Sequence, residues 1–147
     1  MESIVGKYKT AKVYSMIGET RGVFPVEEVM ESMKDDPMGL QEFKQTIEGY
    51  YEFTEDHRIL EWYKIPEGCS EEEIQSAREA GEIADVRDGY FTDGDSKPWK
   101  EEDGKFWYDT KQHREMMGEI LSSWDELKEE DGLIVFGGGF AYLKKID

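Results

Sequence analysis

Four Asp-Gly pairs punctuate the second half of this chain, at residues 88–89, 93–94, 103–104 and 131–132. Asp and Gly tolerate the positive φ angles of two-residue hairpin turns, so such a pair between β-prone runs predicts a β-hairpin. The runs around the pairs are rich in aromatic and β-branched residues. The expected strands lie within residues 83–92, 97–103, 105–110, 119–128, 133–138 and 140–146.

The first half of the chain mixes strands and helices. Residues 3–16 have the composition of a long strand. Apolar residues at helical spacing follow Pro25 and resume after Pro37, which predicts two short helices in sequence. Residues 50–65 return to a period of two and predict a hairpin.

Two further segments are less regular. Ser70 is a candidate N-cap with Glu73 three residues later, and Gly81 stands where a helix would end, so residues 70–81 predict a short helix. Residues 112–120 are interpreted as a helical turn or as part of a strand.

Three consecutive glycines, residues 137–139, raise the question of a phosphate-binding loop. Such a loop joins a strand to a helix, but the residues that follow, 140–146, have the composition of another strand. The glycines therefore predict a tight turn or bulge between the last two strands.

This order of elements predicts a mainly β protein of one domain, residues 1–147. A sequential antiparallel meander can remove its exposed edges by closing into a barrel. We therefore expect an up-and-down β-barrel, with two short helices after the first strand and one inserted helix. A β-sandwich is the alternative.

Three features of the chain resemble the calycin superfamily of lipocalins and fatty-acid-binding proteins. Gly6-Lys7-Tyr8 is similar to the G-x-W that opens lipocalin barrels, two short helices follow the first strand, and residues 138–146 look like a last strand that pairs with the first. The resemblance implies a barrel that binds a small, mostly apolar ligand in its interior. A barrel filled by its own side chains, acting as a protein-interaction module, is the alternative.

The net charge of −17 argues against nucleic acid as a partner, because phosphate binding requires Lys and Arg. The acidity is interpreted first as a solubility feature, and a basic protein partner or a cationic ligand is the alternative. Residues 1–10 contain neither the basic nor the apolar region of a signal peptide, and no stretch is apolar enough to span a membrane. The expected location is the cytoplasm.

No strong catalytic motif is present, so the sequence favours a non-enzymatic protein without a cofactor or a metal. His57 is interpreted as a solvated turn residue and Cys69 as a passive thiol. The acidic residues between 85 and 103 fail the EF-hand pattern, since Lys97 occupies a ligand position. The residues expected to line the ligand site are Tyr8, Arg58, Trp62, Arg87 and Trp107.

Overall fold

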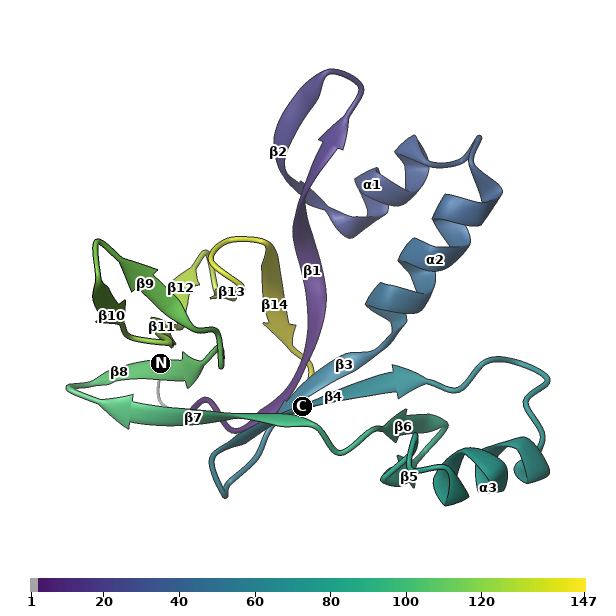
Figure 1. Cartoon of the computed structure of the whole chain (residues 1–147). Coiled ribbons are helices and arrows are strands. Elements are labelled where there is room, and N and C mark those ends of the chain that lie inside the picture. The colour runs from purple at the N-terminus through teal and green to yellow at the C-terminus, as the bar shows by residue number, and fades with distance from the viewer. Residues whose placement is uncertain (1–2) are drawn as a thin grey trace.

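The computed structural model describes residues 3–147 and is mainly β, with 47% strand and 19% helix (Figure 1). Its helices are α1 (Val26–Ser32), α2 (Pro37–Glu48) and α3 (Glu71–Glu79). Its strands are β1 (Gly6–Ile17), β2 (Thr20–Pro25), β3 (Tyr50–Phe53), β4 (Arg58–Lys64), β5 (Asp85–Arg87), β6 (Tyr90–Thr92), β7 (Ser96–Glu102), β8 (Lys105–Asp109), β9 (Arg114–Met116), β10 (Glu119–Leu121), β11 (Trp124–Glu126), β12 (Lys128–Glu130), β13 (Leu133–Phe136) and β14 (Ala141–Lys145).

The main sheet closes almost completely into a barrel. Its strands are hydrogen-bonded in the order β11-β8-β7-β4-β3-β1-β14-β13-β12. The two terminal strands of this path, β11 and β12, are separated in the chain by Leu127 alone. The Leu127 N–H donates to the Phe106 carbonyl at 2.8 Å, and the Leu127 side chain is buried. One continuous segment thus pairs with β8 through its first half and with β13 through its second, which confirms the expected barrel.

The two ends of the barrel differ. Neighbouring strands of the ring are antiparallel, so the strands alternate in direction and the connections between them alternate between the two ends. By this alternation the segments β2-α1-α2, α3-β5-β6 and β9-β10 and the loop 137–140 make the connections at one end, here called the open end. Short turns at 54–57, 103–104 and 131–132 lie at the other, the closed end.

Three of the four Asp-Gly pairs form the predicted hairpin turns. Asp88, Asp103 and Asp131 have φ angles of 49°, 56° and 52°, and each following glycine is also positive. The pair 93–94 instead connects β6 to β7, two strands that both pair with β4. The glycines 137–139, with φ angles of 65°, 70° and 102°, turn the chain between β13 and β14, as predicted.

Two segments differ from the sequence-based expectation. β2 was not expected, and it pairs with the second half of β1 to form a hairpin that extends past the barrel. Residues 114–121 form the β9-β10 hairpin and no helix. Met117 and Gly118 both have positive φ angles, which an α-helix excludes and a two-residue hairpin turn requires.

Buried side chains fill the closed half of the barrel. Tyr8 and Phe53 pack edge to face with their ring centroids 5.1 Å apart, and Trp99 packs against Phe106. The remaining members of this cluster are Ile4, Ile59, Tyr108, Leu127, Ile134 and Leu143. The rings supply a large apolar area per residue, which suits a small barrel.

A second, smaller core lies on the outer face of β3 and β4. Side chains alternate along a strand, so Ile59 on β4 faces the barrel interior while Leu60 and Trp62 face outward. Trp62 and Leu60 pack there with Tyr50, and the β5-β6 hairpin covers them through Tyr90. None of the helices in residues 3–147 combines the length and apolar character needed to cross a membrane.

Gly6 is expected to be intolerant of a side chain. Its φ is 148°, and a Cβ there would lie 2.5 Å from the Asp147 carbonyl oxygen, because the C-terminal segment crosses directly over it. We expect Gly6→Ala to lower the free energy of unfolding by roughly 1–3 kcal/mol, measured by urea denaturation. Gly22→Ala is the matched control, since nothing lies within 4 Å of its added Cβ. Equal effects of the two substitutions would contradict this account.

Candidate functional site

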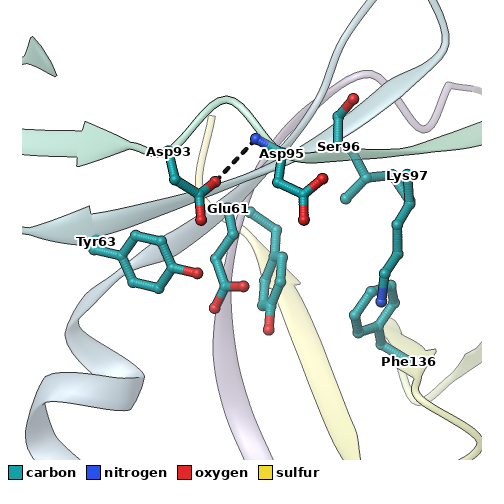
Figure 2. A pocket seen from close by; sticks show the side chains of 9 residues that line it. Glu61, Tyr63, Asp93, Asp95, Ser96, Lys97 and Phe136 are labelled. Atoms are coloured by element: carbon teal, nitrogen blue, oxygen red, sulfur yellow. Dashed lines mark hydrogen bonds between the residues drawn. The ribbon is translucent and has the colours of Figure 1, made fainter. Parts of the chain in front are cut away.

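The barrel interior is not filled at its open end. A cavity of about 130 Å³ remains there, partly open to solvent (Figure 2). We call it the barrel cavity. Its lining residues come from β3, β4, β7, β13 and the β6-β7 turn, and they are Tyr51, Ile59, Glu61, Tyr63, Asp93, Asp95, Ser96, Lys97 and Phe136.

Strand alternation positions the deepest of these side chains. On β4, Ile59, Glu61 and Tyr63 share the inward face, so the strand passes from the buried core to the cavity and then to its rim. Tyr51 on β3 packs against Phe136 at 5.1 Å between ring centroids. These aromatic rings form the apolar wall of the cavity.

Acidic side chains form much of the rim. Figure 2 shows Asp93 and Asp95 on the turn above Glu61. The Asp95 N–H donates to the Asp93 carboxylate at 2.9 Å, which holds this turn in place. Asp93 and Asp95 are exposed, whereas Glu61 is half-buried.

Burial in the barrel shifts the pKa values of Glu61 and of the two tyrosines beside it. Burial raises the pKa of the Glu61 carboxyl group, and hydrogen bonding from Tyr63 opposes this shift. The pKa of Tyr63 is raised to about 12 by burial and by the charge of Glu61, and the pKa of Tyr51 is raised for the same two reasons. Both phenols therefore keep their protons at neutral pH and face the carboxylate as donors.

Lys97 is the cation that lines the barrel cavity. It lies opposite Ile59 in the β4-β7 register, and its side chain extends along the cavity toward Phe136 (Figure 2). Its charge lowers the pKa of Glu61, yet within residues 3–147 no cation forms an ion pair with Glu61 inside 4 Å. With three carboxylates and one ammonium group, the lining carries an excess of negative charge.

The five residues expected to line the site lie outside this cavity. Tyr8 is part of the closed half of the core, where its hydroxyl donates to the Ile4 carbonyl at 2.8 Å. Arg58 is exposed beside the β3-β4 turn and pairs with Asp56 at 3.1 Å. Trp107 faces outward from β8, between the inward-facing Phe106 and Tyr108.

Trp62 and Arg87 are the two that the structure brings together. The Arg87 guanidinium lies 4.7 Å from the Trp62 ring centre, on the outer face of the barrel. The indole N–H of Trp62 donates to Glu52 at 3.1 Å, and Glu52 also pairs with Arg87 at 3.7 Å. These contacts fasten the β5-β6 hairpin to the outside of β4. Ligand contact by any of the five stays a prediction.

One feature of the sequence indicates the cavity residues that were not predicted. In the run 59–63 an acidic residue, Glu61, occupies the inward-facing register between Ile59 and Tyr63. A carboxyl group on the buried face of a strand is costly unless it has a partner or a role. Trp62, which the sequence predicts as a lining residue, lies on the opposite face of the same strand.

His57 and Cys69 do not line the barrel cavity. The His57 ring stacks on Trp99 at 4.2 Å outside the cavity. The pKa of the Cys69 thiol is raised by burial and by the Glu73 charge, which disfavours a reactive thiolate. No group of three or more His, Cys, Asp or Glu side chains in residues 3–147 is arranged to hold a metal ion.

No protein family, curated protein or solved structure matches the chain.

Proposed function

We propose that this protein is a non-enzymatic, calycin-like binding protein whose small ligand lies in the barrel cavity. The observation that carries the proposal is the uneven filling of the barrel. Its closed half is packed with side chains, and its open half retains a lined cavity beneath the long connections. Barrels of about eight strands either fill their interior or enclose one small ligand, and this barrel combines both arrangements.

The size of the cavity supports a ligand with a single ring. An engineered cavity of about 150 Å³ accommodates benzene. The barrel cavity, at about 130 Å³ and partly open, is of the same order. The rings of Tyr51, Tyr63 and Phe136 offer faces and edges against which an aromatic ring packs favourably.

The charge of the cavity supports a ligand that carries an ammonium group. Glu61 lies deepest among the acids and has no ion-pair partner among the described residues 3–147, while Asp93 and Asp95 add negative charge at the rim. A charge-assisted hydrogen bond to a carboxylate is about twice as strong as a neutral one. The expected ligand is therefore more polar than the mostly apolar one that the calycin resemblance implies.

Three compounds with one ring and different charge test the proposal. We expect benzylamine to bind at least tenfold more tightly than benzyl alcohol or benzoate, because a charged hydrogen bond contributes roughly 1.5–3 kcal/mol. Isothermal titration calorimetry measures the three affinities, and the midpoint of thermal unfolding should rise with benzylamine concentration. Equal affinities for all three compounds would contradict the proposal that the acidic lining selects an ammonium group.

A protein-interaction module is the second candidate. Its support is the β9-β10 hairpin, which stands apart from the barrel sheet and exposes Met116, Met117 and Ile120. If none of the three ring compounds binds, the cavity proposal fails and the interaction module becomes the better account.

A further inference from the structure

One side of the β1-β2 hairpin exposes large apolar side chains. Helix α1 packs on this hairpin, and the residues along it alternate between half-buried and exposed. Cross-strand partners share a face, so Tyr14 with Val23 and Met16 with Arg21 lie together on the exposed side. Tyr14 is 46% and Met16 is 52% exposed.

The exposed side of the hairpin continues onto the outer face of the barrel. On β14, Leu143 is buried in the core, so Tyr142 and Lys144 face outward. Their partners on β1, Lys12 and Lys9, share that outer face. Two more outward-facing cations therefore extend the exposed side of the hairpin along β1.

We call this combined surface the basic face. Its cations are Lys9, Lys12, Arg21, Lys128 and Lys144, and its exposed apolar residues are Tyr14, Met16 and Val23. Within residues 3–147, none of these cations forms an ion pair inside 4 Å. The acids at its edges are Glu130, Asp131 and, at the hairpin turn, Glu19. Cations thus outnumber acids here, although the whole chain has a net charge of −17.

The β9-β10 hairpin is a second exposed surface with large apolar side chains. Within the described residues it pairs with no strand of the barrel sheet. Ile120 pairs with Glu115 on one face, and Met116 pairs with Glu119 on the other. Ile120 is 78% exposed, and Met117 at the turn is 97% exposed. A hairpin with uncovered apolar side chains on both faces gains stability from a partner.

The β9-β10 hairpin is also acidic and fixed at its base. The Arg114 guanidinium donates to the Asp125 carboxylate at 2.8 and 3.2 Å, which ties the hairpin to β11 and offsets its one arginine. Glu115, with His113 at 3.5 Å, and Glu119 supply the remaining charge. Figure 1 shows the β1-β2 and β9-β10 hairpins projecting from different parts of the barrel. The chain therefore carries two separate surfaces of opposite charge.

We propose that the β9-β10 hairpin of one copy docks on the basic face of a second copy of this chain. Each surface offers exposed apolar side chains whose burial favours association, and their opposite charges fix the orientation. The inference goes beyond the proposed function and does not depend on it, because none of these residues lines the barrel cavity.

The net charge sets the conditions for this association. Two copies of net charge −17 repel each other at low salt. At physiological ionic strength, charges more than about 8 Å apart are largely screened. Contacts between the two complementary surfaces then determine the affinity, so the experiment is carried out at physiological salt.

Sedimentation equilibrium of the full chain tests the proposal. We expect the average mass of the wild type to rise above the monomer mass through the micromolar concentration range. Lys12→Glu with Arg21→Glu reverses the basic face, and Glu115→Lys with Glu119→Lys reverses the hairpin. Each double variant alone should associate at least tenfold more weakly, because like charges then meet. An equal mixture of the two should regain the wild-type association, since both of its contacts again join opposite charges.

The matched control is Glu71→Lys with Glu72→Lys, on the exposed first turn of α3. It changes the net charge as much as the hairpin variant does and should associate like the wild type. A monomeric wild type, a mixture that stays monomeric, or a control that dissociates as fully as the hairpin variant would overturn the proposal. Failure of benzylamine to bind would leave it standing, so the two proposals fail separately.

Discussion

Replacing Trp62 with alanine is expected to lower the free energy of unfolding by about 3–5 kcal/mol, the usual cost of truncating a buried tryptophan. Trp62 is 0% exposed and holds the outer core together. It stacks on Tyr50, contacts Arg87 through its ring face and donates to Glu52. The substitution leaves a cavity under the β5-β6 hairpin and removes one of the two partners of the Glu52 carboxylate.

Thermal unfolding measures this effect, with an expected fall in the midpoint of about 10 °C. Benzylamine affinity should not change at a temperature where the variant is folded, because Trp62 faces away from the barrel cavity. Trp107→Ala is the control: this outward-facing ring is only half-buried, and we expect a loss of at most about 1 kcal/mol. A Trp62→Ala protein of normal stability and reduced benzylamine affinity would instead place Trp62 in the ligand site, as the sequence suggested.

Replacing Glu61 with glutamine is expected to weaken benzylamine binding by about 10- to 100-fold, the range for loss of a charged hydrogen bond. The substitution keeps the shape of the side chain and removes its charge. Calorimetry on the wild type and on Glu61→Gln measures the difference. Glu72→Gln, on the exposed surface of α3, changes the net charge equally and should leave the affinity unaltered.

The same pair of proteins has a defined pH dependence. The pKa of Glu61 is raised in the folded state above its ordinary value of 4.5. At pH values between the ordinary pKa and the raised pKa of Glu61, the folded state holds more protons than the unfolded state. The contribution of Glu61 to the free energy of unfolding therefore decreases as the pH rises through that range. Glu61→Gln should lack this decrease in the free energy of unfolding, measured by urea denaturation.

The affinity of the wild type for benzylamine should fall as the pH drops toward the raised pKa of Glu61, because protonation removes the charge of the carboxylate. Parallel pH profiles of the two proteins would contradict the assignment.

The local elements were largely accessible from the sequence because their signals are short-range. Pro25 and Pro37 bound the two helices, and Ser70 accepts the Glu73 N–H at 3.2 Å as the cap of α3. The hairpin within residues 112–120 was not predicted, because its turn, Met117-Gly118, lacks the Asp or Asn that usually marks a two-residue hairpin. Strand β2 was not predicted, because Thr20–Pro25 is short and polar at its start.

The site was less accessible because it depends on which face of each strand turns inward. The run 59–63 alternates, but alternation alone does not say whether the Trp62 face or the Glu61 face meets the barrel axis. Apolar and polar side chains occupy both faces of β4, since the β5-β6 hairpin covers Leu60 and Trp62 from outside. A cover of that kind is formed by residues about thirty positions away, and no local pattern reports it.

The sequence by itself determined a mainly β chain of antiparallel hairpins with helices after the first strand, because turn chemistry and hydrophobic period act over a few residues. It also determined the acidic character that the proposed ligand must complement. Only the tertiary structure decided which side chains share a cavity. Closure through the continuous segment 124–130 brings Tyr51, Glu61 and Phe136 from three separate strands around one space. Long-range pairing sets the size and charge of that space, and both quantities exist only once the ring is closed.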